Sequence, residues 1–198
     1  MNNTPRNLSK AGVALLTGLA LSFSANAAGS PDDFARGCSA GKGNDCFKLG
    51  EAYLRGSVTA RDFAKAKASF EKACSLKDGM GCRLLSVCYA LGNGTSKNLK
   101  KGHGLYDRAS SRNDGIGCAN AGFDLSHGVL GSTDYAGAKK YFEKGCCQLK
   151  SGESCKNLGV LYEFGYGVSQ DLGRARDLYQ QSCSLGEQDS CRELQKLQ

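Results

Sequence analysis

The cysteines are the residues of this chain whose type and spacing most directly imply chemistry. Of the eleven cysteines, four pairs have seven residues between their members: Cys38 and Cys46, Cys74 and Cys82, Cys147 and Cys155, and Cys183 and Cys191. Zinc ligands usually come as closely spaced pairs supported by histidine, and redox pairs as CxxC, and neither pattern occurs. The repeated spacing therefore predicts four structural disulfides, each contributing about 2.5 kcal/mol in the chain-entropy model.

Three cysteines remain outside these pairs. Ser110 stands where the spacing would place a partner for Cys118. Because helix ends alternate in a stack of helices, we expect Cys118 to lie at the same end as Cys146 and to form a bridge with it. Cys88 is then the free thiol, and its alignment with apolar positions of the other repeats predicts an inert core cysteine.

A search for catalytic residues finds no oriented nucleophile or metal site. The two histidines, His103 and His127, belong to no HExxH motif, and the chain has no GxSxG motif and no Walker loop. Ser69 and Lys72 match SxxK, but Phe70 between them is a packing residue of the repeat, and neither SDN nor KTG follows. We expect His103 on exposed helix surface and predict no catalytic residue, no metal and no cofactor.

The first 27 residues are typical of a secretory signal. Arg6 and Lys10 precede an apolar run over residues 11–23, and Ala25-Asn26-Ala27 provides a cleavage site. The run is too short to span a bilayer, which needs about 20 residues. We therefore expect an exported chain of residues 28–198 without a membrane span. Its cysteine content indicates an oxidising compartment, which predicts a periplasmic or secreted protein.

The charge of the exported chain excludes one class of partner. The formal net charge of +7 falls to +5 when Arg6 and Lys10 are removed, and the remaining cations are interspersed with 19 acidic residues. Nucleic-acid binding needs a clustered basic stripe, ideally with aromatic side chains for stacking. We therefore predict no nucleic-acid partner.

Two series of residues recur with a period of 36. Aromatic residues stand at Phe34, Phe70, Tyr106, Phe142 and Tyr179, and cysteines at Cys46, Cys82, Cys118, Cys155 and Cys191. Such a period indicates stacked supersecondary units. We expect a half unit over residues 31–45, full units over about 46–81, 82–117, 118–154 and 155–190, and a C-terminal cap over 190–198.

Each unit divides into two helices by its apolar spacing. Leu158-Gly159 followed by Tyr162, like Leu49-Gly50 followed by Tyr53, places one face of a first helix inward. Glycine pairs such as Gly92 and Gly94 end this helix. Small residues flank the aromatic of a second helix, and no strand-like alternation appears. The sequence predicts an all-α, α/α solenoid of helix-turn-helix units similar to TPR repeats.

The combination of leucine-glycine, an aromatic, glycine-x-glycine and a helix such as Phe70-Glu71-Lys72-Ala73-Cys74 resembles the Sel1-like repeat. The cysteine pairs make the chain similar to the secreted cysteine-rich branch, the Helicobacter cysteine-rich protein family. The likeness covers about residues 31–198. It implies the solenoid fold, and because this branch is labelled as β-lactamase, it also implies penicillin binding or slow β-lactam hydrolysis.

In solenoids of this type the first helices line the concave wall, where partners usually dock. We therefore expect a partner-binding surface along one face of these helices, with mixed apolar and charged character. It consists of Phe47, Glu51, Arg55, Arg83, Val87, Phe123, His127, Lys156, Val160 and Glu163. An equally weighted alternative is that Val87, Phe123 and Val160 pack between repeats. Asp124 departs from the apolar pattern, which indicates a distorted third unit or a polar partner such as His127.

The leading functional hypothesis is an exported scaffold or adaptor whose concave face binds another protein or peptide. A narrower version is an immunity protein that neutralises a secreted toxin. The alternative from the family resemblance is a β-lactam-binding or slowly β-lactam-hydrolysing protein, with a β-lactam or cell-wall fragment as ligand. The short polar terminal helix favours a monomer.

Overall fold

The computed structural model describes residues 29–57 and 60–197, so the predicted signal sequence over residues 1–27 lies outside the described part. The described chain is all-helical and has no strand. Its elements are α1 (Pro31–Ser39), α2 (Gly43–Arg55), α3 (Phe63–Ser75), α4 (Gly79–Leu91), α5 (Leu99–Ser110), α6 (Gly115–Ser126), α7 (Tyr135–Glu143), the π-helix η3 (Lys144–Gln148), α8 (Gly152–Phe164), α9 (Leu172–Ser184) and α10 (Gln188–Lys196).

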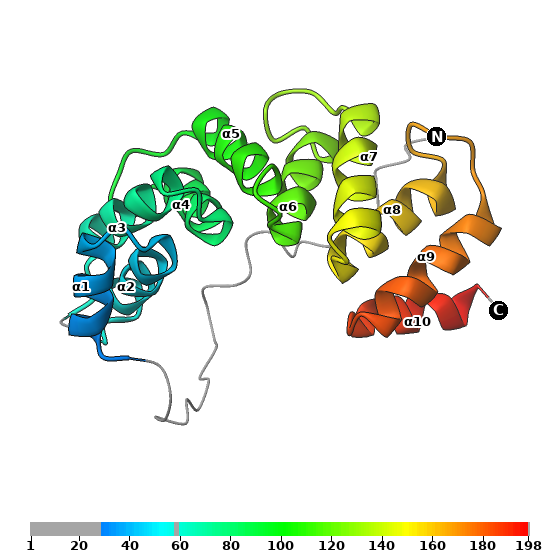
Figure 1. Cartoon of the computed structure of the whole chain (residues 1–198). Coiled ribbons are helices and arrows are strands. Elements are labelled where there is room, and N and C mark those ends of the chain that lie inside the picture. Colours follow the sequence, from blue (N-terminus) through cyan, green and yellow to red (C-terminus); the bar gives the residue numbers. More distant parts are fainter. Residues whose placement is uncertain (1–28, 58–59, 198) are drawn as a thin grey trace.

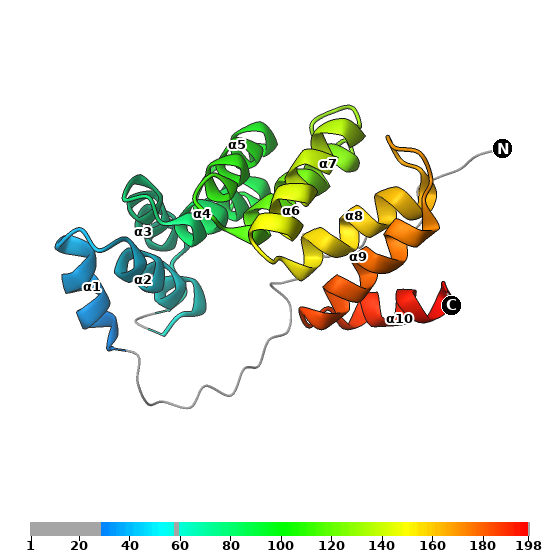
Figure 2. The ribbon, with the colours of Figure 1, turned by 45° about the vertical axis from the view of Figure 1, so that its right-hand side comes forward.

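The helices pack as consecutive antiparallel pairs along an arch. The most extensive contacts join α2 to α3, α4 to α5, α6 to α7 and α8 to α9, which are the two helices of each predicted unit. Figures 1 and 2 show these pairs following one another in chain order from α1 to α10. The predicted α/α solenoid is confirmed.

Side-chain caps fix where each second helix begins. Asp62, Asn98, Asp134 and Asp171 each precede a second helix, and each side chain accepts a hydrogen bond from the backbone N–H three residues further on. Such a cap contributes about 1 kcal/mol. Upstream, Gly92 ends α4 with a left-handed φ of 81°, which glycine adopts without a Cβ clash. The turn between the two helices is therefore defined at both ends.

In three of the four units an aromatic ring of the second helix packs against a glycine of the first helix, and in the unit of α4 and α5 Ser86 stands at the glycine position. A Cβ on Gly50 would lie 2.5 Å from the Phe70 ring, and one on Gly122 would lie 2.4 Å from the Phe142 ring. Phe70 and Phe142 are completely buried. The leucine-glycine motif of the sequence is thus the seat of the repeat's own aromatic residue, which explains why the two features share a period.

Three of the predicted disulfides are present in the structure: Cys38–Cys46, Cys74–Cys82 and Cys183–Cys191. Each joins the last turn of a second helix to the first helix of the next unit. Each bridge closes a short loop at the turn where the chain passes between units, so the bridges staple successive units together.

The predicted Cys147–Cys155 and Cys118–Cys146 bridges are wrong. The structure pairs Cys146 with Cys155, nine residues apart, and leaves Cys118 and Cys147 as free thiols. Cys146 follows Phe142 by four residues, as Cys74 follows Phe70. This register turns Cys146 inward, where it is fully buried, and leaves Cys147 exposed. The five residues of η3 lie at the site of the extra residue in this repeat.

Candidate functional site

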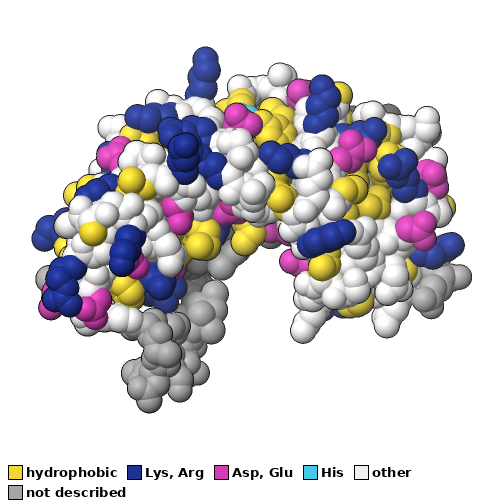
Figure 3. All heavy atoms as spheres, viewed as in Figure 1, with side chains coloured by type: hydrophobic (Ala, Val, Ile, Leu, Met, Phe, Trp, Pro, Cys, Tyr) yellow, Lys and Arg dark blue, Asp and Glu magenta, His cyan; other side chains and the backbone are white. Residues whose placement is uncertain are grey.

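The first helices form the inner row of the arch. Successive first helices α2, α4, α6 and α8 contact one another more extensively than any two successive second helices do. Closer spacing along one row bends a solenoid toward that row. The first helices therefore line the side on which the arch is hollow, where Figure 3 shows apolar side chains among charged ones.

Two of the predicted residues form ion pairs between units. Arg83 Nε lies 3.0 Å from Asp114 Oδ2, and the other oxygen of Asp114 accepts from the Gly117 N–H at 2.8 Å. Lys156 Nζ lies 3.8 Å from Glu187 Oε2, at the equivalent place two repeats further along the stack. Arg83 and Lys156 thus each reach the start of the next first helix. Their charges are directed to a neighbouring repeat rather than to the hollow.

Two other members of the predicted surface lie within the packing. Phe47 is 9% exposed and Val160 is 6% exposed, and each belongs to an apolar core cluster. Lys156 is similarly buried at 7%. Val160 therefore follows the alternative prediction, in which it packs between repeats. For Phe47 and Lys156 burial is a correction, because both were expected on the open wall.

Val87, Phe123 and His127 remain partly exposed on α4 and at the end of α6. The rings of Phe123 and His127 stack with centroids 3.7 Å apart. His127 Nδ1 lies 3.0 Å from the Phe123 carbonyl oxygen and 3.2 Å from Ser126 Oγ. These contacts fix the imidazole against the helix end, so the two rings form one flat, partly accessible surface.

Three further residues of the predicted surface, Glu51, Arg55 and Glu163, form polar contacts within their own repeat. Arg55 lies 2.9 Å from Glu51 on the same helix and is exposed. Glu163 accepts a hydrogen bond from the Tyr179 hydroxyl at 2.6 Å. Burial, followed by this bond, raises the pKa of Tyr179, so the phenol remains a donor. Glu163 therefore joins α8 to α9.

Asp124 has a polar partner, but not His127. Its Oδ2 lies 3.3 Å from His103 Nδ1, and both side chains are mostly buried. His103 was expected on exposed surface, and the structure instead places it between α5 and α6, with its ring edge against Tyr141 at 6.3 Å. This pair explains how a carboxyl is accommodated at a position that is apolar in other repeats.

The SxxK match has a structural role. Ser69 is 8% exposed, and its hydroxyl donates to the Lys65 carbonyl at 2.8 Å, within its own helix. A serine oriented in this way is engaged with the backbone. Within residues 29–57 and 60–197, no group of three or more His, Cys, Asp or Glu side chains is arranged to hold a metal ion. In the same residues no helix has the length and apolar character needed to cross a membrane.

A second opening lies on the side of the second helices and is lined by Cys147 and Glu143, among others. It was not expected from the sequence. The signal available in the sequence was Leu178, which stands where the preceding repeat has Tyr141. The leucine at this position indicates an open space only when the hydrogen bond of Tyr141 to Asp107 in the preceding repeat is known.

Helix pairs of 36-residue period, an aromatic seated on a glycine, and disulfides between units define a disulfide-stapled repeat scaffold. The family model described as Sel1 repeat matches residues 45–78, 79–114, 116–148 and 152–187. The chain belongs to the Sel1 repeat family.

Similar proteins place it near the cysteine-rich members of this family. Beta-lactamase HcpA of Helicobacter pylori is 52% identical over 42 residues, which are 21% of this chain and 16% of HcpA. HcpC of the same species is 56% identical over 39 residues, 20% of this chain and 13% of HcpC. The matched segments therefore span only a small part of the length of these curated relatives.

Solved structures share the fold. A protective antigen of uropathogenic Escherichia coli superposes with a TM-score of 0.74 at 22% identity, over 83% of this chain and 35% of that one. Helicobacter pylori cysteine rich protein B superposes with a TM-score of 0.55 at 29% identity, over 68% of this chain and 96% of that one. The first of these likenesses concerns the fold alone.

Proposed function

We propose that this protein is an exported scaffold that binds a partner protein on the inner wall of the arch. Membership of the Sel1 repeat family supports the general class, because Sel1 repeats typically mediate contacts between proteins. Export rests on the predicted signal sequence and on four disulfides, which persist in oxidising compartments. This reasoning favours the periplasm or the extracellular space.

The Phe123–His127 stack is the single observation that favours the inner wall. Neighbouring candidates are buried or engaged in ion pairs between units, whereas these two rings and Val87 stay accessible. Phenylalanine is among the aromatic residues enriched in the buried core of protein interfaces. We therefore assign the central contact to Phe123 and His127, with Val87 on the adjacent helix.

In-cell crosslinking of the oxidised, mature protein, followed by mass spectrometry of the captured envelope proteins, tests this proposal. Phe123→Ala should abolish a stoichiometric complex while leaving thermal unfolding nearly unchanged. Ile116→Ala is the matched control, since Ile116 is an apolar side chain exposed to 46% at the start of the same helix. A complex that survives Phe123→Ala, or is lost equally with Ile116→Ala, rejects the inner-wall assignment.

The narrower hypothesis of an immunity protein predicts that the captured partner is a secreted toxin and that its activity is blocked on binding. The β-lactam alternative rests on the family resemblance and on the similarity to Beta-lactamase HcpA. A chromogenic β-lactam assay on the purified, oxidised protein separates it from the scaffold proposal. Turnover above buffer would favour an enzyme, and its absence together with a partner complex would favour the scaffold.

A further inference from the structure

An acidic residue follows the packing aromatic of three successive second helices. These residues are Glu71, Asp107 and Glu143. Two of them accept a hydrogen bond from a tyrosine of a neighbouring helix. The Tyr89 hydroxyl lies 3.4 Å from Glu71 Oε1, and the Tyr141 hydroxyl lies 2.8 Å from Asp107 Oδ1. The repeat thus uses carboxylates on its outer side as acceptors for phenols.

The third carboxylate lacks the kind of partner that Asp107 has. Tyr162 stands where Tyr89 stands, but among the described residues no hydrogen bond joins it to Glu143, and Arg174 lies over its ring at 4.3 Å. Leu178 occupies the position on α9 that Tyr141 occupies on α7, and a leucine cannot donate a hydrogen bond. The ion pair recorded for Glu143 is with Lys139 of its own helix, at 3.5 Å. Where Tyr141 bridges α5 and α7, the space between α7 and α9 remains open.

This opening, which we call the outer groove, is a cavity of about 370 Å³. Its lining residues are Lys140, Glu143, Lys144, Cys147, Gln148, Leu158, Arg174 and Leu178. A volume of this size falls within the range of ordinary ligand pockets. The groove is therefore large enough for an aromatic side chain and a short stretch of backbone.

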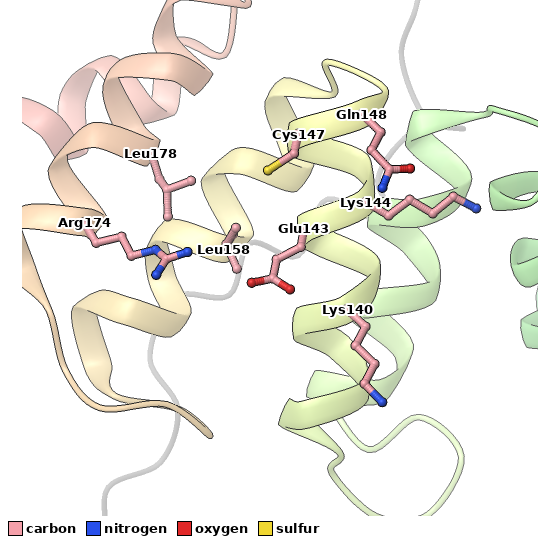
Figure 4. Close-up of a pocket in the computed structure, with 8 residues that line it drawn as sticks. All are labelled: Lys140, Glu143, Lys144, Cys147, Gln148, Leu158, Arg174 and Leu178. Carbon is pink, nitrogen blue, oxygen red and sulfur yellow. The ribbon is translucent and has the colours of Figure 1, made fainter.

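Figure 4 shows how the side chains are arranged. Glu143 and Cys147 point into the outer groove from one wall, Arg174 points in from the opposite wall, and Leu158 and Leu178 lie between them. Lys140, Lys144 and Gln148 extend away from that space. Leu158 is 1% exposed and Leu178 is 8% exposed, so they form a narrow apolar floor between a carboxylate acceptor on one side and a guanidinium donor on the other.

We propose that the outer groove binds a tyrosine side chain of a partner protein, with the ring against Leu158 and Leu178 and the hydroxyl donating to Glu143. The contact between Tyr141 and Asp107 one repeat earlier is the template for this occupant. Arg174 favours a carboxylate beside that tyrosine. The site lies mainly on the second helices α7 and α9, with Leu158 of α8 at its floor, and does not include the inner-wall residues Phe123 and His127.

The protonation state of the phenol supports this chemistry. Partial burial, followed by the bond to Asp107, raises the pKa of Tyr141 to about 12. A tyrosine held in the same surroundings by Glu143 remains protonated at neutral pH and can donate. Phenylalanine would fill the same volume without this bond, so the two residues provide a sharp comparison.

Cys147 makes a direct test possible, because its free thiol lies in the groove itself. The protein is equilibrated with equal amounts of the mixed disulfides of acetyl-Cys-Gly-Tyr-amide and acetyl-Cys-Gly-Phe-amide with 2-mercaptoethanol, so that the Cys147 thiolate attacks the peptide sulfur and 2-mercaptoethanol leaves. Adducts on Cys147 are then quantified by mass spectrometry. We expect the tyrosine adduct to exceed the phenylalanine adduct about tenfold, the effect of one hydrogen bond to a charged acceptor. In Glu143→Ala the ratio should fall to about one.

The matched control moves the thiol by one repeat. Ser111 is exposed at the position equivalent to Cys147, beside the space that Tyr141 bridges. The double variant Cys147→Ser/Ser111→Cys should therefore show a ratio of about one. Leu178→Tyr should fill the outer groove and remove the preference for tyrosine at Cys147.

Three results would overturn the proposal. The first is equal tyrosine and phenylalanine adducts on the wild-type protein, and the second is a tyrosine preference that persists in Glu143→Ala. The third is a dimer whose formation excludes both peptides from Cys147, which would assign the groove to a second copy of the chain. Each result leaves the inner-wall proposal intact, since that proposal depends on Phe123.

Discussion

Ser110 Oγ lies in direct contact with Cys118 Sγ, and both side chains are buried. The two residues occupy the positions that Cys74 and Cys82 occupy one repeat earlier, where a disulfide joins them. The disulfide expected in this repeat is thus absent because Ser110 replaces a cysteine, while the two side chains still meet as they do in the preceding repeat.

Ser110→Cys should complete this missing staple. In the chain-entropy model a loop of this length stabilises the fold by up to about 2.5 kcal/mol, which corresponds to a rise of roughly 5 °C in the melting temperature. Peptide mapping should show the new bridge to Cys118, and thiol titration of the unfolded protein should find two free thiols rather than three. The gain should vanish in the background of Cys118→Ser, and four free thiols in the single variant would contradict the prediction, because the new cysteine would then be unpaired.

The three free thiols should react with an alkylating reagent in a fixed order. Cys147 is exposed, whereas Cys88 and Cys118 are buried. Burial raises the pKa of Cys88 to about 11, and burial, partly offset by the contact with Ser110, raises that of Cys118. At pH 8 both buried residues therefore remain largely thiols, which are poor nucleophiles.

Iodoacetamide should modify one cysteine per native molecule within minutes, and the other two only after unfolding. Mass spectrometry of proteolytic fragments identifies the modified residue. Cys147→Ser should abolish the fast reaction and leave the Cys146–Cys155 bridge intact. Fast labelling of Cys146 instead would show that the bridge uses Cys147, contrary to the structure.

The sequence predicted the architecture because the features that determine it are periodic. A 36-residue period links each leucine-glycine pair to its aromatic, so the two helices and their contact could be inferred together. The pairing of Cys155 could not be inferred from cysteine spacing, because the repeat contains an extra residue. Counting from Phe142 instead would have identified Cys146, since helical register decides which cysteine points inward.

The partners of Asp124 and Glu143 were beyond sequence inference for a different reason. His103 lies 21 residues from Asp124, on another helix, and its exposure depends on how α5 and α6 pack. The outer groove exists because Leu178 is shorter than a tyrosine and carries no hydroxyl. Leucine and tyrosine both fit the hydrophobic pattern of the helix, so the difference does not stand out in the sequence. The groove could be inferred only from the contact that Tyr141 makes in the structure.

The glycine that contacts the ring of Phe142 should tolerate no side chain, although the equivalent position in the unit of α4 and α5 is Ser86. In Gly122→Ala the new Cβ would lie 2.4 Å from the ring of Phe142, which is fully buried and has no room to move. We expect a loss of about 2 kcal/mol or more in the free energy of unfolding, measured by urea denaturation. Gly104→Ala is the matched control, because no atom lies within 4 Å of its new Cβ on α5.

The control should change stability in the opposite direction. Alanine in a helix interior is favoured over glycine by about 1 kcal/mol, so Gly104→Ala should stabilise the protein by roughly that amount. Equal effects of the two substitutions would show that helix propensity, rather than the contact with Phe142, determines the response at Gly122.

Glu153 gives the protein a measurable dependence on pH. Burial is the main cause that raises the pKa of this carboxyl, the charge of Glu187 raises it further, and Lys156 and Arg83 oppose the shift. A carboxyl with a raised pKa binds its proton more tightly in the folded state, so its stabilising effect is present at low pH and is lost as pH rises through the folded-state pKa. At neutral pH the ionised form therefore destabilises the fold.

Glu153→Gln removes this charge and should raise the melting temperature at pH 7, while the difference from the wild type should shrink as the pH is lowered toward 4. Thermal unfolding across this range measures the effect. Asp177→Asn serves as the control, since Asp177 is an exposed carboxyl on α9. A lower melting temperature for Glu153→Gln than for the wild type at pH 7 would instead mean that the charge of Lys156 outweighs the burial of Glu153.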